Sequence, residues 1–139
     1  MANPKTFEGG CLCGAVRYRI DSDLERVSHC HCSMCRRASG AAMVTWATVP
    51  EATFATVKGE LRWFQSSDHG RRAFCAQCGT PILFATTRDP RWLDVTVGSL
   101  DAPELVTPKR HVYEPDRLRW LVMPDNLPRH GEDSSSPEL

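Results

Sequence analysis

Seven cysteines in a chain of 139 residues constrain the fold more than any other feature. They fall in three clusters, and none stands alone: Cys11 and Cys13; Cys30, Cys32 and Cys35; Cys75 and Cys78. An odd number of cysteines cannot be fully paired as disulfides within one chain. Such short spacings are typical of metal sites, and ligation by thiolates alone selects zinc or an iron–sulfur cluster. The pattern therefore predicts metal binding, with zinc favoured.

Seven ligands divide naturally into four and three. A structural zinc takes four protein ligands, whereas a catalytic zinc takes three and keeps one position open. The central cluster supplies three sulfurs by itself, and in an extended segment Cys30 and Cys32 face one side while His31 faces the other. The two outer pairs then form a closed site that clamps the N-terminal strand to the middle of the chain. We expect two zinc ions per chain.

A second division of the cysteines stays open at this point. It joins Cys32 and Cys35 to Cys75 and Cys78 as a ribbon-like zinc site and leaves Cys30 without a partner pair.

Charge and hydropathy limit the partners of the chain. Lys plus Arg and Asp plus Glu both number 17, so the formal net charge is zero and a general nucleic-acid binder is not expected. A local basic stretch remains, because residues 26–72 carry seven basic and three acidic side chains, a net charge of +4. Residues 1–8 lack the apolar core of a signal peptide, and no run approaches the ~18 apolar residues of a membrane span. We therefore expect no membrane partner and a cytoplasmic location, where thiols stay reduced.

Short β-like runs between turn signals set the expected fold class. Ten Pro and nine Gly argue against a helical bundle. Residues 15–20 alternate well, with Val16, Tyr18 and Ile20 on one face. One short helix is expected over residues 33–39, beginning at a capping-type Ser33. The further expected strands are 42–49, 61–65, 71–74, 82–85 and 93–97. The sequence predicts a mostly β single domain over residues 1–125 with at most short helical turns, and a C-terminal tail, 126–139, that is disordered at least from residue 131.

Three motifs together resemble those of one enzyme family. They are Gly9-Gly10-Cys11-Leu12-Cys13-Gly14, Cys30-His31-Cys32-Ser33-Met34-Cys35-Arg36-Arg37, and Phe74-Cys75-Ala76-Gln77-Cys78-Gly79-Thr80-Pro81. In these segments the chain resembles the glutathione-dependent formaldehyde-activating enzyme (GFA) family. The resemblance implies a zinc-stapled β-tent fold and carbon–sulfur lyase activity, the reversible addition of the thiol of glutathione to formaldehyde. It also implies that Cys11, Cys13, Cys75 and Cys78 hold a structural zinc and that Cys30, Cys32 and Cys35 hold a catalytic one.

An open zinc on three thiolates suits the chemistry of a thiol and an aldehyde. Such a centre takes a fourth ligand, deprotonates a bound thiol and polarises a carbonyl. The expected partner is a small thiol–aldehyde adduct derived from glutathione, such as S-hydroxymethylglutathione. Arg36 and Arg37 follow the cluster and are candidates for binding its carboxylates. His29 and His69 are candidates for a fourth ligand or a proton relay, whereas His31 and Trp46 are expected to pack rather than to react.

Two other classes of function stay open as alternatives. A zinc-stabilised binding or scaffold module without catalysis is one, since a similar domain occurs in a eukaryotic centromere-associated protein. A thiol redox enzyme such as a methionine sulfoxide reductase is the other. That chemistry needs a cysteine free of metal, and all seven cysteines have zinc partners in the division above.

Overall fold

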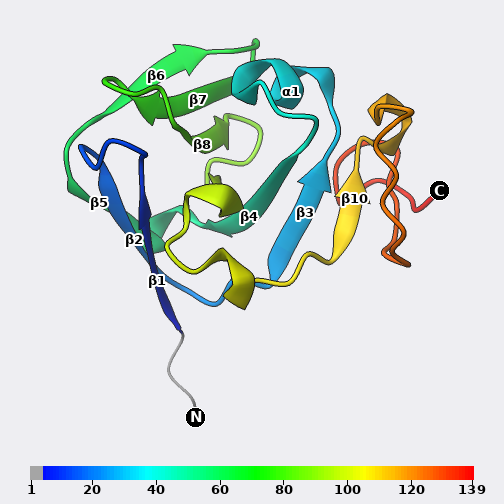
Figure 1. Cartoon of the computed structure of the whole chain (residues 1–139), viewed down its shortest axis with the longest axis horizontal. Coiled ribbons are helices and arrows are strands. Elements are labelled where there is room, and N and C mark those ends of the chain that lie inside the picture. The colour runs from blue at the N-terminus through cyan, green and yellow to red at the C-terminus, as the bar shows by residue number, and fades with distance from the viewer. Residues whose placement is uncertain (1–4) are drawn as a thin grey trace.

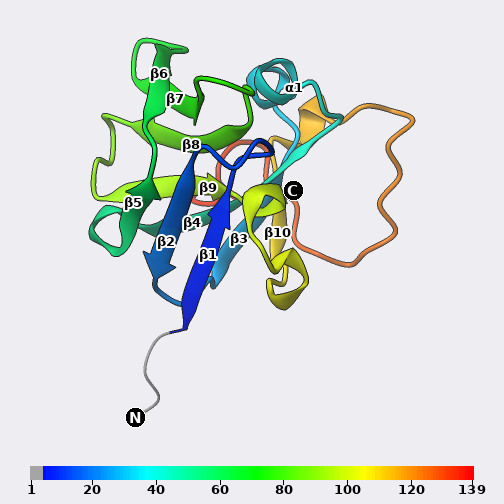
Figure 2. The same cartoon turned by 60° about the vertical axis from the view of Figure 1, so that its left-hand side comes forward.

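The computed structural model describes residues 5–139 and contains two sheets that lie around a common core (Figures 1 and 2). The smaller sheet has the order β1 (Thr6–Gly10), β2 (Arg17–Asp21), β5 (Phe54–Lys58). The larger has the order β10 (Arg110–Val112), β3 (Arg26–Cys30), β4 (Val44–Pro50), β9 (Trp92–Thr96), β8 (Pro81–Thr86), β7 (Gly70–Cys75), β6 (Leu61–Gln65). One α-helix, α1 (Ser33–Ser39), connects β3 to β4, and four single-turn 3₁₀ helices lie at Glu51–Thr53, Val97–Ser99, Pro103–Leu105 and Glu114–Asp116. The predicted mostly β, single-domain class is confirmed.

The core lies between the two sheets. On β2, Tyr18 and Ile20 are fully buried, while Arg19 points outward, so the predicted alternation is confirmed. They pack with Val27, Val49 and other apolar side chains from the larger sheet in one continuous cluster. Burial of this kind stabilises by roughly 25 cal/mol per Å² of apolar surface. The apolar faces of two sheets therefore hold each other in place.

Six predicted strands and the helix over residues 33–39 agree with the structure within two residues at each end. Four strands, β1, β3, β5 and β10, were not predicted. The pair Gly9-Gly10 in β1 is of a type common in turns, yet a Cβ at Gly9 would lie 2.4 Å from the Tyr18 hydroxyl oxygen and 2.5 Å from the Ser99 carbonyl oxygen. Glycine is needed there for close approach within a strand. The short β10 is parallel to β3, about 80 residues earlier in the chain, and no local pattern reports such a pairing.

The first turn of α1 is capped by sulfur rather than by a serine hydroxyl. Cys32 is the N-cap residue, and its Sγ accepts a hydrogen bond of 3.3 Å from the backbone N–H of Cys35. The expectation that Ser33 caps the helix is wrong. A cysteine at this position both begins the helix and directs its sulfur into the turn.

The C-terminal segment runs along the outer edge of β10. The N–H of His111 donates to the carbonyl oxygen of Pro128, and the N–H of His130 donates to the carbonyl oxygen of His111. Further on, the N–H of Leu139 donates to Arg129. These bonds supply the edge of β10 with backbone partners. The boundary between domain and tail at residue 125 stays a prediction.

Among residues 5–139, no helix combines the length and apolarity needed to cross a membrane.

A carboxylate within the larger sheet has an altered pKa. Asp94 on β9 lies opposite Thr48 on β4, and the Thr48 hydroxyl donates to it. Burial raises the pKa of Asp94 from 3.8 to about 6. The folded protein therefore binds the Asp94 proton more tightly than the unfolded chain does. The free energy of unfolding then falls as pH rises from about 4 to about 6, where the folded carboxylate ionises.

We predict that Asp94→Asn removes the fall in the free energy of unfolding between about pH 4 and about pH 6, while keeping a hydrogen-bond acceptor for Thr48. In urea unfolding at pH steps from 4 to 7, we expect the variant to gain about 2 kcal/mol over the wild type as pH rises. The exposed Glu104→Gln is the control and should follow the wild type. A difference between Asp94→Asn and the wild type that does not change with pH would contradict the prediction.

Candidate metal centre

Four cysteines from distant parts of the chain come together where the two sheets meet. Cys11 and Cys13 follow β1, and Cys75 and Cys78 lie at the end of β7 and in the turn to β8. All four Sγ atoms lie within 4.8 Å of one another. Those of Cys11 and Cys13 are 3.6 Å apart, and those of Cys13 and Cys75 are 3.8 Å apart. Tetrahedral zinc with Zn–S bonds of about 2.3 Å needs sulfurs about 3.8 Å apart, so this group fits a closed zinc site.

Two glycines allow the chain to turn around this group. Gly14 follows Cys13 and Gly79 follows Cys78, with φ of 81° and 80°. A side chain other than glycine is strained in this left-handed region. The turns aim backbone N–H groups at sulfur, since Val16 donates to Cys11 at 3.2 Å and Gln77 donates to Cys75 at 3.4 Å. Such donors stabilise negatively charged sulfur.

The remaining three cysteines form a second group at the junction of β3 and α1. Cys30 ends β3, Cys32 caps α1, and Cys35 lies in the first turn of α1. Their three Sγ atoms also lie within 4.8 Å of one another, with 3.5 Å between Cys30 and Cys35. The structure thus groups the seven cysteines as four and three. It does not bring Cys32 and Cys35 together with the outer pair Cys75 and Cys78.

The protonation of the three thiols indicates what the group can bind. Hydrogen bonds from Cys30 and Cys35 lower the pKa of Cys32, whereas the contact with Cys32 raises the pKa of Cys30. One thiolate is thus favoured at the expense of its neighbours, because like charges this close repel. Deprotonating all three requires a cation. A soft, all-sulfur donor set of three fits zinc with a fourth position free for another ligand.

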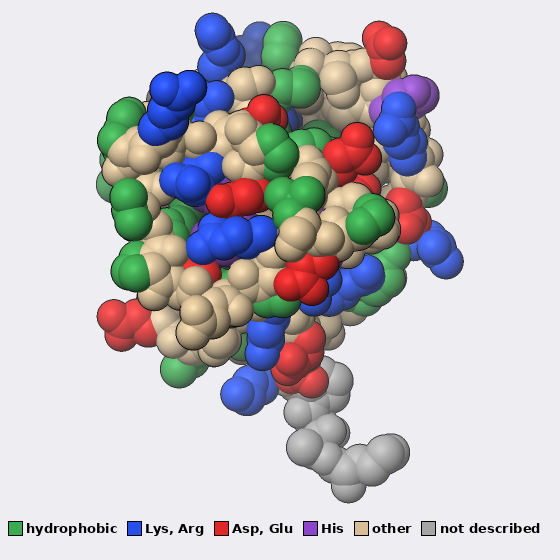
Figure 3. Space-filling view, turned by 90° about the vertical axis from the view of Figure 1, so that its right-hand side faces the viewer, with side chains coloured by type: hydrophobic (Ala, Val, Ile, Leu, Met, Phe, Trp, Pro, Cys, Tyr) green, Lys and Arg blue, Asp and Glu red, His purple; other side chains and the backbone are tan. Residues whose placement is uncertain are grey.

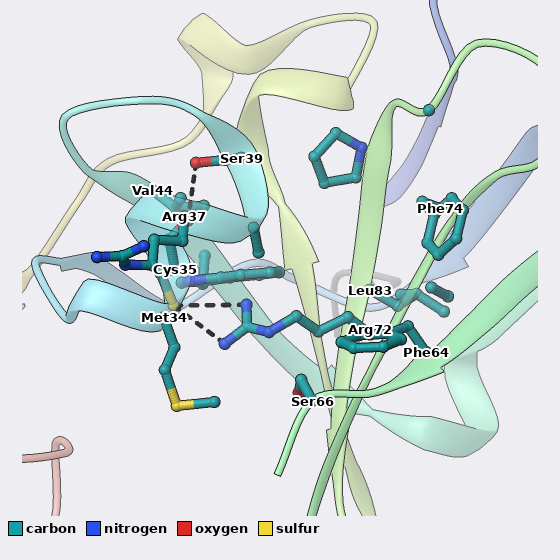
Figure 4. Close-up of a pocket in the computed structure, with 15 residues that line it drawn as sticks. Met34, Cys35, Arg37, Ser39, Val44, Phe64, Ser66, Arg72, Phe74 and Leu83 are labelled. Carbon is teal, nitrogen blue, oxygen red and sulfur yellow. Dashed lines mark hydrogen bonds between the residues drawn. The ribbon is translucent and has the colours of Figure 1, made fainter.

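An arginine that the sequence analysis missed lies against this group. Both terminal nitrogens of Arg72, on β7, are 3.6 Å from the Cys35 Sγ (Figure 4). Its guanidinium lies 5.0 Å from the ring centre of Phe84. Arg72 is 37 residues from Cys35 in the sequence, and only the pairing of β7 with β8 places it there. The guanidinium offsets negative charge on the sulfurs.

A cavity of about 590 Å³ opens beside Cys35 and Arg72. Its walls come from α1, the start of β4 and the β6–β7–β8 part of the larger sheet. Arg37 lines it, and Arg72 extends across it toward Cys35 (Figure 4). Trp46, which the sequence analysis expected only to pack, is buried and also forms part of the wall. The three-cysteine group therefore borders a space that can hold a small molecule.

The other polar candidates lie in different places. Arg36 does not line the cavity, and its Nε is 3.5 Å from the carbonyl oxygen of His31. His29 contacts Thr45 through Nδ1 at 2.8 Å, and His69 lies 3.3 Å from Thr87. Neither histidine is grouped with the three cysteines.

His31, which lies between Cys30 and Cys32 in the sequence, is fully buried and packs on His111. The ring centroids are 5.1 Å apart, and His31 Nε2 lies 2.8 Å from His111 Nδ1. His111 in turn contacts Asp125 through Nε2 at 2.9 Å, and Glu114 lies 3.7 Å from His31. These hydrogen bonds fix the segment between Cys30 and Cys32 against β10, which places the two sulfurs.

Comparison with known proteins identifies the family. A family model described as glutathione-dependent formaldehyde-activating enzyme matches residues 6–116, most of the chain. The chain belongs to the GFA family. All seven cysteines, the cavity and Arg72 lie within the matched residues.

Three known proteins resemble the chain in sequence or structure. A Halomonas elongata protein named as belonging to the glutathione-dependent formaldehyde-activating enzymes is 30% identical over 121 residues, which cover 81% of this chain and 69% of that protein. A Schizosaccharomyces pombe protein named as a lyase of uncharacterized activity is 30% identical over 88 residues, 58% of each chain. The crystal structure of a Rhodobacter sphaeroides protein superposes with a TM-score of 0.60 at 27% identity, over 73% of this chain and 96% of that one.

We predict that an exposed cysteine of the four-sulfur group contributes far more stability than its exposure suggests. Cys13→Ala should lower the free energy of unfolding by more than about 2 kcal/mol, because it breaks a metal site that holds two sheets together. Leu12→Ala, at a neighbouring side chain that is 90% exposed, is the matched control and should stay within about 0.5 kcal/mol. Equal effects in urea unfolding of the zinc-loaded proteins would contradict a metal clamp.

We predict that the second group binds its own metal ion. The wild type should hold two zinc ions per chain, and Cys30→Ala should hold one while keeping the sheet signal in circular dichroism. Ser33→Ala, an exposed change between Cys32 and Cys35, serves as the control and should keep both ions. If elemental analysis finds two zinc ions per chain in Cys30→Ala, Cys30 is not a ligand of the second metal ion and the assignment is wrong.

Proposed function

We propose that the chain is a zinc-dependent carbon–sulfur lyase that acts on a thiol–aldehyde adduct such as S-hydroxymethylglutathione. The observation that carries the proposal is the three-cysteine group at the wall of a cavity, with the guanidinium of Arg72 beside it. The names of its relatives in the GFA family support the same activity. We further propose a reducing, cytoplasmic location, because the seven thiols must stay free of disulfides to bind metal.

Zinc held by Cys30, Cys32 and Cys35 would supply two effects when bound, deprotonation of a thiol and polarisation of a carbonyl. Addition of a thiol to an aldehyde needs both, and the reverse reaction, cleavage of the carbon–sulfur bond, needs the same groups. The closed four-sulfur group has no free position, so its role is structural.

Arg72 prepares the site for an anionic thiol. Three thiolates and one dication carry a net charge of −1, and the guanidinium 3.6 Å from Cys35 brings the local charge to zero. A negatively charged thiolate that approaches the site then meets no net repulsion.

Arg37 is the proposed contact for a carboxylate of the thiol. It is exposed at the cavity, so its fork of N–H groups is free to hold a carboxylate in two parallel hydrogen bonds. For Arg36 a similar role stays a prediction, and its contact with His31 favours a local structural role.

The surface gives no comparable support to a nucleic-acid-binding module. On the face that carries β10 and the C-terminal segment, Lys, Arg, Asp and Glu are interspersed (Figure 3). Within the basic stretch, Arg26 stacks on Trp92 at 4.3 Å and Arg71 stacks on Trp63 at 4.2 Å. The guanidinium groups of Arg26 and Arg71 are held over aromatic rings. Binding of a phosphate backbone instead needs several basic side chains in a continuous row on the surface.

We predict that the zinc-loaded protein accelerates the exchange between free and glutathione-bound formaldehyde. Two-dimensional exchange NMR with labelled formaldehyde and glutathione measures the rate directly against the uncatalysed background. Cys35→Ser should reduce the acceleration by at least about 100-fold, because it removes a ligand of the open centre. No acceleration by protein that holds two zinc ions would contradict the enzyme and favour the binding module.

A further inference from the structure

The cavity beside the three-cysteine group is much larger than formaldehyde requires. Its volume is about 590 Å³, whereas a molecule the size of water occupies about 30 Å³ in a liquid. Most of the space must therefore belong to another part of the ligand.

The cavity wall is predominantly apolar. The larger apolar side chains that line it include Met34, Trp46, Phe64, Phe74, Pro81 and Leu83. Among all its lining residues, charge comes from Arg37 and Arg72, and hydroxyl groups come from Ser39 and Ser66. A tripeptide with two carboxylates and an amino group pairs poorly with such a wall, because burying a polar group without a hydrogen bond is costly. A hydrocarbon group of the ligand binds more favourably against this apolar wall.

The register of the strands explains why apolar and cationic groups alternate here. Phe64 on β6 lies opposite Arg72 on β7, and Arg72 lies opposite Phe84 on β8. Their side chains share one face of the sheet, so Arg72 rests on the ring of Phe84. Its guanidinium reaches toward Cys35 (Figure 4). Phe64 remains 62% exposed at the cavity. A ligand that covers this ring removes apolar surface from water.

Two unpartnered polar atoms also lie at this cavity. Among residues 5–139, three buried side-chain polar atoms lack a hydrogen-bond partner, and two of them are Ser66 Oγ and Arg72 Nε. Both residues line the cavity. The two atoms themselves are buried, so a ligand oxygen would accept from the terminal N–H groups of Arg72, which extend across the cavity (Figure 4). The adduct of an aldehyde with a thiol carries such an oxygen on the carbon next to sulfur.

We propose that the aldehyde carries a hydrocarbon substituent of several carbons, aliphatic or aromatic, which fills this cavity while the adduct oxygen lies toward Arg72 and the thiol lies toward Arg37. The inference rests on the proposed function and specifies its substrate class. The reaction is balanced without a further reactant: the carbon–sulfur bond breaks, the hydroxyl proton moves to the leaving thiolate, and the aldehyde is released.

Stable thioethers of glutathione test the cavity without any reaction. We expect S-hexylglutathione to bind the zinc-loaded protein at least about tenfold more tightly than S-methylglutathione in isothermal titration calorimetry, since each buried methylene contributes about fourfold in affinity. In exchange NMR, the glutathione adduct of hexanal should be turned over with a correspondingly higher kcat/KM than the adduct of formaldehyde.

Two variants locate the effect. Ala38 is exposed on α1 and lines the cavity, so Ala38→Trp fills the space from the surface and should abolish the preference for S-hexylglutathione. Trp63 lies beside Phe64 on β6 but lines a different hollow, so Trp63→Ala is the matched control and should keep the preference. Both variants are checked for two zinc ions per chain.

The outcomes separate the two proposals. Equal binding of both thioethers, with the formaldehyde adduct still turned over, would overturn the hydrocarbon substituent and leave the lyase standing. If the Ala38→Trp variant still prefers S-hexylglutathione, the hydrocarbon substituent does not bind in this cavity, and the proposed location is wrong. Turnover of neither adduct by protein that holds two zinc ions would overturn both proposals.

Discussion

The rest of the structure depends on the close approach of four thiols at the junction of two sheets. Cys11 and Cys13 leave the smaller sheet, and Cys75 and Cys78 lie in the β7–β8 connection of the larger one. Four sulfurs within 4.8 Å cannot all carry charge unless a cation neutralises them, so we expect a bound metal ion to stabilise this arrangement. Because the β7–β8 hairpin also carries Arg72, the same clamp fixes a group that acts at the second centre.

The second centre combines features that a closed zinc site does not need. Its three sulfurs are supplied within six residues, by the end of a strand and the first turn of a helix. The protein then adds a guanidinium from β7 and an apolar wall from four strands, β4, β6, β7 and β8. The metal ligands that we propose are thus clustered in the sequence, whereas the tertiary fold builds the wall beside them. With this separation, residues of the wall can change while the three cysteines stay in place.

Local sequence signals predicted the parts of this molecule that are determined locally. The helix over residues 33–39 and six strands followed from turn residues and alternation, and the cysteine spacing predicted the groups of four and three that the structure brings together. Long-range pairing accounts for what was missed. β10 is a strand because it lies beside β3, and Arg72 reaches Cys35 only because β7 pairs with β8. No spacing in the sequence reports either contact. Likewise, Trp46 packs and lines a cavity at once, and its residue type does not distinguish the two roles.

The separation in sequence between the two halves of the clamp has a consequence during synthesis. Cys13 and Cys75 are 62 residues apart, so the first pair of thiols emerges from a ribosome on the order of several seconds before its partners exist. Cys30, Cys32 and Cys35 emerge together and are complete as a metal-binding unit far earlier. The three-cysteine group is thus complete on the nascent chain before the four-cysteine group, and β10 can join β3 only after about 80 further residues have been made. In the order of synthesis, the three-cysteine group therefore precedes the four-cysteine group and the strands β6, β7 and β8 of the cavity wall.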